Sequence, residues 1–187
     1  MGKSETEAMR NKLVEDGLDS YLDALTAVRE FQNEIIKRSR RALEEKLTDL
    51  SEAMGISVKR EDIKDYTYPA KLTDEELGKE GWVGIEFSNK PVLYCHFGLC
   101  FEREDSKCVT KVVVSMWTDN VSRRDFLLEH CKKVSRDFDN YDGYNIGLFM
   151  PITKDEINNF EAKLQELIDK WIEVWERVGG IKKLPEV

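Results

Sequence analysis

The chain has 187 residues, of which 41% are hydrophobic and 35% are charged. This composition is typical of a folded domain with a heavily charged surface and argues against a disordered chain. The net charge of −8 disfavours broad, non-specific nucleic-acid binding, because neutralising phosphates requires a concentrated basic surface.

The first residues are polar and acidic, and no uninterrupted apolar run approaches the roughly 18 residues that a membrane-spanning helix needs. Secretion and membrane insertion are therefore not expected. Of the four cysteines, Cys95, Cys100 and Cys108 lie in or beside apolar, strand-like segments, and a chain of this size does not depend on disulfides to fold. We expect reduced, mostly buried cysteines and a cytoplasmic protein.

Residues 18–54 carry hydrophobic side chains at three- and four-residue steps, which predicts a long amphipathic helix. Gly55 is a natural stop for this helix, and Gly17 predicts at most a kink or a short turn near its start. The apolar stripe is about 55 Å long at 1.5 Å per residue, which is longer than a small four-stranded sheet is expected to cover. The helix therefore has surface available for self-association or for a partner.

Four cations fall within five positions of this helix: Lys37, Arg38, Arg40 and Arg41. They are the candidate contacts for a phosphate group or a partner. The alternative is a solvated helix face that neighbouring glutamates partly neutralise, and the sequence favours it.

Three apolar runs rich in β-branched and aromatic residues predict the central strands, namely residues 82–87, 92–103 and 108–118. Their short connections predict consecutive hairpins and hence an antiparallel sheet. Residues 56–72 read as an irregular or edge-strand connection, and residues 73–76 as the start of a short helical turn.

A second helix is predicted to begin at Ser122, followed by an acidic loop over residues 137–144. A fourth strand over residues 146–150 and a helix from Thr153 to Val178 complete the chain. The order α-β-β-β-α-β-α predicts an α+β fold in which an antiparallel sheet of about four strands is packed by a long N-terminal and a C-terminal helix. We expect one domain over residues 1–187, with residues 1–55 as a helical arm and residues 56–180 as the core.

The spacing of the candidate ligands in the sequence argues against a metal site. The cysteine and histidine set lacks a C-x2-C pair, and Cys95 and Cys100 point to opposite faces of a strand. In the acidic loop, alignment of Gly143 with the obligatory glycine of a calcium loop places Phe138 at the first ligand position. We therefore predict no catalytic, cofactor-binding or metal-binding residue.

Aromatic residues are concentrated in the predicted sheet: Trp82, Tyr94, Phe97, Phe101 and Trp117. Such residues form either a platform on which bases stack or the hydrophobic face beneath packed helices. Few Lys or Arg residues are interleaved with them, which favours core packing.

The run from Gly81 to Phe87, then the run from Tyr94 to Glu102, then a third strand and a helix, resembles the non-catalytic C-terminal region of some bacterial and phage proteins whose N-terminal part is a PD-(D/E)XK nuclease. The resemblance covers residues 60–178. The catalytic pattern itself is missing, because Glu86 and Lys90 have the wrong spacing. The resemblance thus implies a standalone accessory or recognition module and transfers no functional residue.

The leading hypothesis is a non-enzymatic interaction protein of a bacterial or phage cytosol, which forms a homodimer or binds a partner through its long helix. The alternative is a nucleic-acid-associated binder or a metal-dependent, nuclease-like enzyme. In that alternative, phosphate would lie on the four cations of the helix, or a metal on Glu86, Glu102 and Asp119.

Overall fold

The computed structural model describes residues 3–68, 80–89, 93–104, 107–140 and 143–186. The chain forms two compact units, residues 1–34 and residues 35–187. The short helical turn predicted at residues 73–76 lies outside the described residues. Among the described residues, no helix is long and apolar enough to cross a membrane.

Helix α1 spans Lys3–Met54 and therefore contributes to both units. It is helical through Gly17, so the short turn considered there does not form. The helix ends as predicted, because Gly55 adopts the left-handed conformation with φ of 66°, which is accessible to glycine without a Cβ clash. In the second unit, Ile35, Leu43 and Leu50 of this helix are fully buried.

Six strands form one antiparallel sheet in the order β1-β2-β3-β4-β6-β5. Their bounds are Lys64–Tyr68 for β1, Glu80–Asn89 for β2, Leu93–Glu104 for β3, Lys107–Trp117 for β4, Phe138–Asn140 for β5 and Asn145–Pro151 for β6. The expectation of about four strands is thus too low by two short edge strands. Strand β1 lies at the edge of the sheet, which is one of the two alternatives predicted for residues 56–72. Strand β5 occupies part of the predicted acidic loop.

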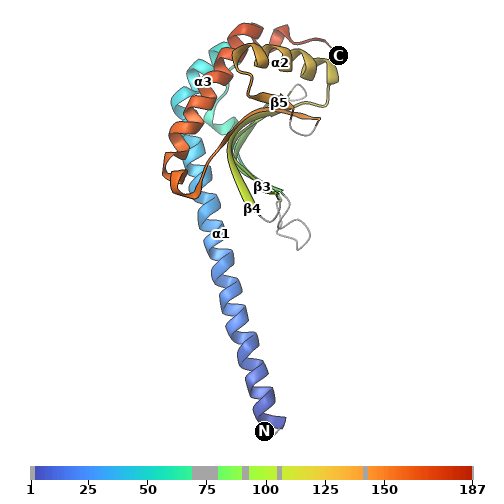
Figure 1. Cartoon of the computed structure of the whole chain (residues 1–187). Coiled ribbons are helices and arrows are strands. Elements are labelled where there is room, and N and C mark those ends of the chain that lie inside the picture. Colours follow the sequence, from blue (N-terminus) through green and yellow to red (C-terminus); the bar gives the residue numbers. More distant parts are fainter. Residues whose placement is uncertain (1–2, 69–79, 90–92, 105–106, 141–142, 187) are drawn as a thin grey trace. The chain divides into compact units, whose positions relative to one another are not determined.

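Helix α2 spans Val121–Val134, and helix α3 spans Phe160–Val178 after a 3-10 turn at Lys154–Asn159. Figure 1 shows α2, α3 and the C-terminal part of α1 on one side of the curved sheet. The predicted cap at Thr153 forms on the 3-10 turn, where the Thr153 backbone N–H donates to Glu156 at 3.0 Å. Gly179 ends α3 with φ of 82°, as predicted.

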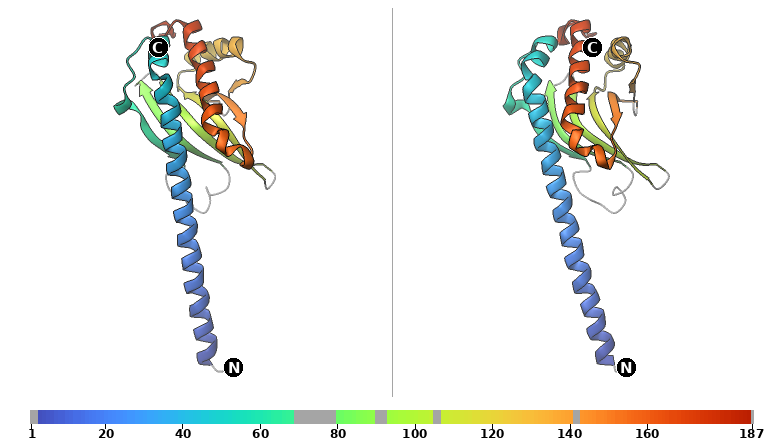
Figure 2. Two further views of the ribbon diagram at one scale, coloured as in Figure 1. Left: turned by 90° about the vertical axis from the view of Figure 1, so that its left-hand side faces the viewer. Right: turned by 60° about the vertical axis from the view of Figure 1, so that its left-hand side comes forward.

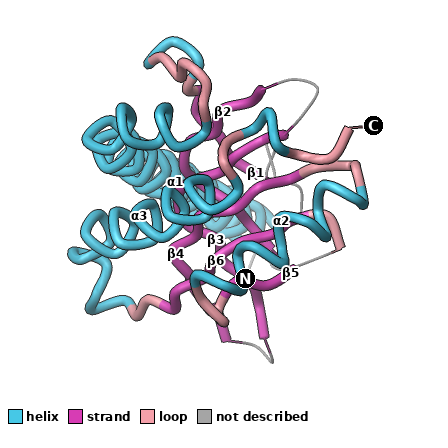
Figure 3. Tube along the Cα trace, turned by 90° about the horizontal axis from the view of Figure 1, so that it is seen from above, coloured by secondary structure: helices cyan, strands magenta, loops and turns pink. Residues whose placement is uncertain are grey.

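The C-terminal part of α1, from Ile35, and helix α3 lie side by side on the sheet, as Figure 2 and the view from above in Figure 3 show. An ion pair of 2.7 Å joins Lys46 to Asp169, and a second of 3.3 Å joins Arg41 to Glu161. Beneath them, Trp171 is fully buried, with its ring 6.0 Å from that of Phe138 and 5.9 Å from that of Trp175. The tryptophan side chains of α3 are therefore part of the core.

Side chains of the sheet alternate between its two faces, and β3 shows the pattern most clearly. Cys95, Phe97 and Leu99 belong to the large core beneath the helices. Cys100 belongs to a second, smaller cluster with Trp82 and Val113, on the opposite face. We call this second side the open face, because α2, α3 and the C-terminal part of α1 lie on the other side of the sheet in Figure 1.

Candidate functional site

An apolar stripe on α1 is the first candidate for a functional surface. It comprises Val14, Leu18, Tyr21, Leu25 and Val28, which alternate at steps of four and three residues. Val14 and Tyr21 are 65% and 61% exposed, and Leu18 is 54% exposed. Large apolar side chains gathered at this exposure are typical of an interaction surface.

Three of the four cations predicted as candidate phosphate or partner contacts have partners within the fold. Arg38 donates to the carbonyl oxygens of Ile157 and Asn158, at 3.0 and 2.8 Å. Arg40 donates to Asp65 at 2.7 Å, while Arg41 pairs with Glu161.

The fourth cation, Lys37, is exposed. Arginines that tie α1 to α3 and to β1 account for most of this charge cluster without an external ligand. The sequence favours a helix face that neighbouring glutamates of the same helix partly neutralise, and the structure differs in the origin of the partners. The partners come from distant segments rather than from the same helix.

Replacing Arg38 by glutamine should destabilise the fold substantially. The Arg38 side chain is 15% exposed, and its guanidinium lies 5.3 Å over the Phe160 ring and makes two hydrogen bonds to carbonyls. Charge-assisted hydrogen bonds of this kind contribute about 1.5–3 kcal/mol, so we expect a loss of about 2–3 kcal/mol in the free energy of unfolding. Urea denaturation measures this loss. Lys37→Gln is the matched control, because it removes the adjacent charge at an exposed position, and should cost less than about 0.5 kcal/mol. Equal, small losses would contradict a stabilising role for Arg38.

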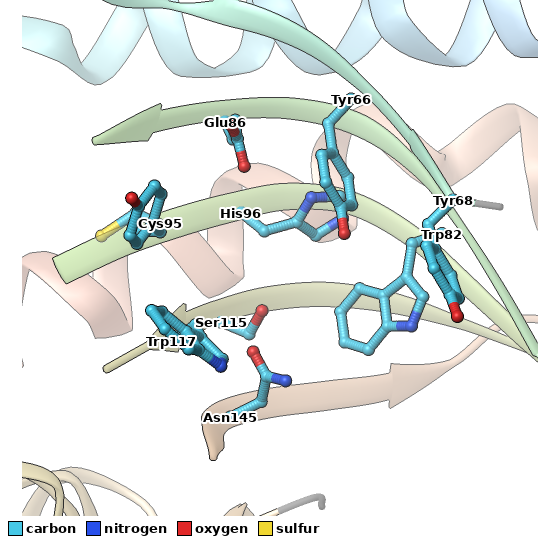
Figure 4. A pocket seen from close by; sticks show the side chains of 10 residues that line it. Tyr66, Tyr68, Trp82, Glu86, Cys95, His96, Ser115, Trp117 and Asn145 are labelled. Atoms are coloured by element: carbon cyan, nitrogen blue, oxygen red, sulfur yellow. The ribbon is translucent and has the colours of Figure 1, made fainter. Parts of the chain in front are cut away.

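A pocket of about 500 Å³ on the open face is the second candidate. Ten residues from β1, β2, β3, β4 and β6 line it: Tyr66, Tyr68, Trp82, Glu86, Tyr94, Cys95, His96, Ser115, Trp117 and Asn145. Cross-strand register brings these residues together, since Tyr68 is opposite Trp82, Glu86 is opposite His96, and Trp117 is opposite both Tyr94 and Asn145. Figure 4 shows their side chains, among which that of Cys95 belongs to the core on the helix side.

Aromatic rings stand at both ends of the pocket. At one end, the Tyr66 and Trp82 rings pack edge-on against His96, with centroids 4.8 and 5.1 Å away. At the other, Trp117 packs edge-on against Tyr94 at 5.4 Å. Figure 4 places Glu86, Ser115 and Asn145 between these two ends.

Two buried polar side chains that line the pocket have no hydrogen-bond partner among the residues that the structure describes. His96 is 8% exposed and Ser115 is fully buried, and neither imidazole nitrogen nor the Ser115 hydroxyl is bonded. Burial lowers the pKa of His96 from 6.5 to about 3, because the charged imidazolium is poorly solvated there. The neutral ring offers one donor and one acceptor. Unbonded buried groups of this kind are uncommon in folded proteins and are consistent with a ligand that supplies their partners.

The cysteine and histidine side chains that the structure describes do not converge on a metal. Cys95 and Cys131 lie in the core on the helix side, whereas His96 and Cys100 lie on the open face. Burial raises the pKa of the Cys131 thiol to about 12 and also raises that of Cys95, so both are protonated at neutral pH. Across the residues that the structure describes, no three His, Cys, Asp or Glu side chains are placed to share a metal ion.

The acids considered for a nuclease-like centre are also apart. Glu86 is opposite His96 in the sheet, whereas Glu102 is six positions further along β3, roughly 20 Å away. Glu102 forms an ion pair with Lys111, and Asp119 follows the opposite end of the β3–β4 hairpin.

The sequence identifies only part of the pocket. The aromatic pattern singles out Trp82, Tyr94 and Trp117, which line the pocket, but it also includes Phe97, which lies in the helix-side core. Tyr66 lines the pocket because β1 pairs with β2. The sequence of a short edge strand does not indicate which strand it pairs with.

Comparison of the chain with protein-family models, curated proteins and solved structures gave no match. The resemblance to an accessory region of PD-(D/E)XK nuclease proteins therefore stays a prediction.

Proposed function

We propose that the chain is a non-enzymatic interaction protein of bacterial or phage origin that self-associates through the apolar stripe of α1. The observation that supports this most is the stripe from Val14 to Val28, whose members lie on one side of the helix within the first compact unit and are exposed except for the half-buried Leu25. Leu22, 50% exposed, lies beside the stripe and widens it.

The spacing of the stripe favours a second copy of the same helix as the partner. Steps of four and three residues over two heptads match the a and d positions of a coiled coil, in which identical stripes pack together. A twofold dimer uses the same surface on both chains, so one stripe is sufficient to form the interface. Burial of its side chains would remove from water the apolar surface that the single chain exposes.

Nucleic-acid binding has less support than self-association. Arg38, Arg40 and Arg41 have partners within the fold, and the chain carries a net charge of −8. A metal-dependent nuclease has less support still, because Glu86 and Glu102 lie far apart along the sheet.

Light scattering coupled to size-exclusion chromatography tests self-association in the full chain. We expect a mass of about twice the 21.8 kDa of one chain at micromolar concentrations. The double variant Leu18→Glu/Leu25→Glu should elute at the single-chain mass. Four carboxylates would then enter each interface in place of leucines, which weakens association at least about a hundredfold.

A matched control separates the stripe from the added charge. Ser20→Glu/Ala27→Glu introduces the same two charges at the same seven-residue spacing, at exposed positions on the opposite side of the helix. This variant should remain dimeric. A full chain that is monomeric, or a control that dissociates as readily as the leucine variant, would disprove the proposal.

A further inference from the structure

The pocket on the open face has a composition that restricts its ligand. Of the ten described residues that line it, five are aromatic, namely Tyr66, Tyr68, Trp82, Tyr94 and Trp117, and none is Lys or Arg. Its volume of about 500 Å³ lies within the range of about 300–1,000 Å³ that is common for small-molecule sites.

The charge of the described lining disfavours anions. The acid Glu86 lines the pocket, and the His96 imidazole is neutral at physiological pH, so the lining residues that the structure describes offer no positive group to balance a phosphate or a carboxylate. A wholly apolar ligand is also disfavoured, because it would leave the imidazole nitrogens of His96 and the hydroxyl of Ser115 buried without partners.

An organic cation satisfies both constraints. The faces of Trp and Tyr rings carry negative partial charge and attract alkylammonium groups, most strongly where water is displaced. Cages of aromatic side chains with an adjacent acid are the usual means by which proteins recognise quaternary ammonium groups. The polar side chains between the two aromatic ends in Figure 4 would then contact a second, hydrogen-bonding part of the same molecule.

We propose that the pocket binds a small organic ammonium ion that carries a hydroxyl or carbonyl group near its charged nitrogen. The aromatic rings enclose the alkylammonium group, and His96 and Ser115 bond the oxygen. This binding function does not depend on self-association through α1, because all ten lining residues belong to the second compact unit.

Isothermal titration of the full chain with matched pairs of probes tests the charge requirement. Choline and acetylcholine are the cations, and 3,3-dimethylbutan-1-ol and 3,3-dimethylbutyl acetate are their uncharged isosteres. We expect both cations to bind at millimolar concentrations or below, at least about tenfold more tightly than the isosteres. Absence of binding by both cations, or equal affinity for an isostere, would overturn the proposal.

Two variants test the contacts. Trp117 is 37% exposed at the edge of the pocket, so Trp117→Leu should leave the fold intact and weaken choline binding at least about fivefold, whereas Trp117→Tyr keeps a ring and should retain most of it. Ser115→Ala removes the unbonded hydroxyl. It should weaken choline binding but leave the affinity for tetramethylammonium, which has no oxygen, unchanged. Equal effects of Ser115→Ala on both ions, or no effect of Trp117→Leu, would refute the assigned contacts.

Discussion

Gly98→Ala should be among the most destabilising single substitutions in the chain. Gly98 of β3 is opposite Gly84 of β2, and a Cβ on Gly98 would lie 2.7 Å from the Gly84 Cα. The obstructing atoms belong to the backbone of a paired strand, so they can move only by breaking the ladder. We expect a loss of at least about 3 kcal/mol in the free energy of unfolding and a melting temperature lower by about 6–12 °C.

The matched control is Gly17→Ala, which adds the same methyl group at a helical position with no atom within 4 Å. It should raise the helix stability by about 1 kcal/mol, because alanine is favoured over glycine in a helix interior. Calorimetry of both variants measures the difference. If Gly98→Ala melted at the wild-type temperature, the two central strands would have to be further apart than the structure places them.

The sequence predicts well the long helices and strands that have a clear local sequence pattern. Strands β2, β3 and β4 follow from runs of β-branched and aromatic residues, and the ends of α1 and α3 follow from Gly55 and Gly179. The short strand β5 could not be predicted in this way. Its residues, Phe138–Asn140, lie in an acidic stretch and become a strand through pairing with Ile146 to Leu148, which is a tertiary contact.

The candidate site was predictable only in part. Successive side chains of a strand point to opposite faces of the sheet. Along β3 this places Tyr94 and His96 on one face and Phe97 on the other, so the spacing in the sequence is enough to divide these aromatic residues. The strand order was the missing information, because it brings Tyr66 and Asn145, 79 positions apart in the chain, to one pocket. His96 and Ser115 are opposite each other in the register of β3 and β4. No sequence motif around either residue predicts that its side chain is buried without a hydrogen-bond partner.

The burial of His96 should make the fold sensitive to acid. Burial lowers the pKa of its imidazole to about 3 in the folded state, compared with 6.5 for an unburied histidine. Below pH 6.5 the unfolded chain therefore binds a proton that the folded chain does not, and stability falls as the pH decreases toward 3. Above pH 6.5 the contribution is fully present. The expected slope is about 1.4 kcal/mol per pH unit.

Comparison with His96→Phe isolates this contribution. Phenylalanine is planar and uncharged, so it retains the edge contacts with Tyr66 and Trp82. The carboxyl groups of the chain are the same in both proteins, so most of their effect cancels in the difference. Urea denaturation from pH 7 to pH 4 should show the wild type losing stability relative to the variant by about 3 kcal/mol. Parallel curves would mean that the folded protein accepts the proton. An imidazolium would then be stable in the pocket, and a cationic ligand would meet repulsion there rather than a neutral hydrogen-bonding ring.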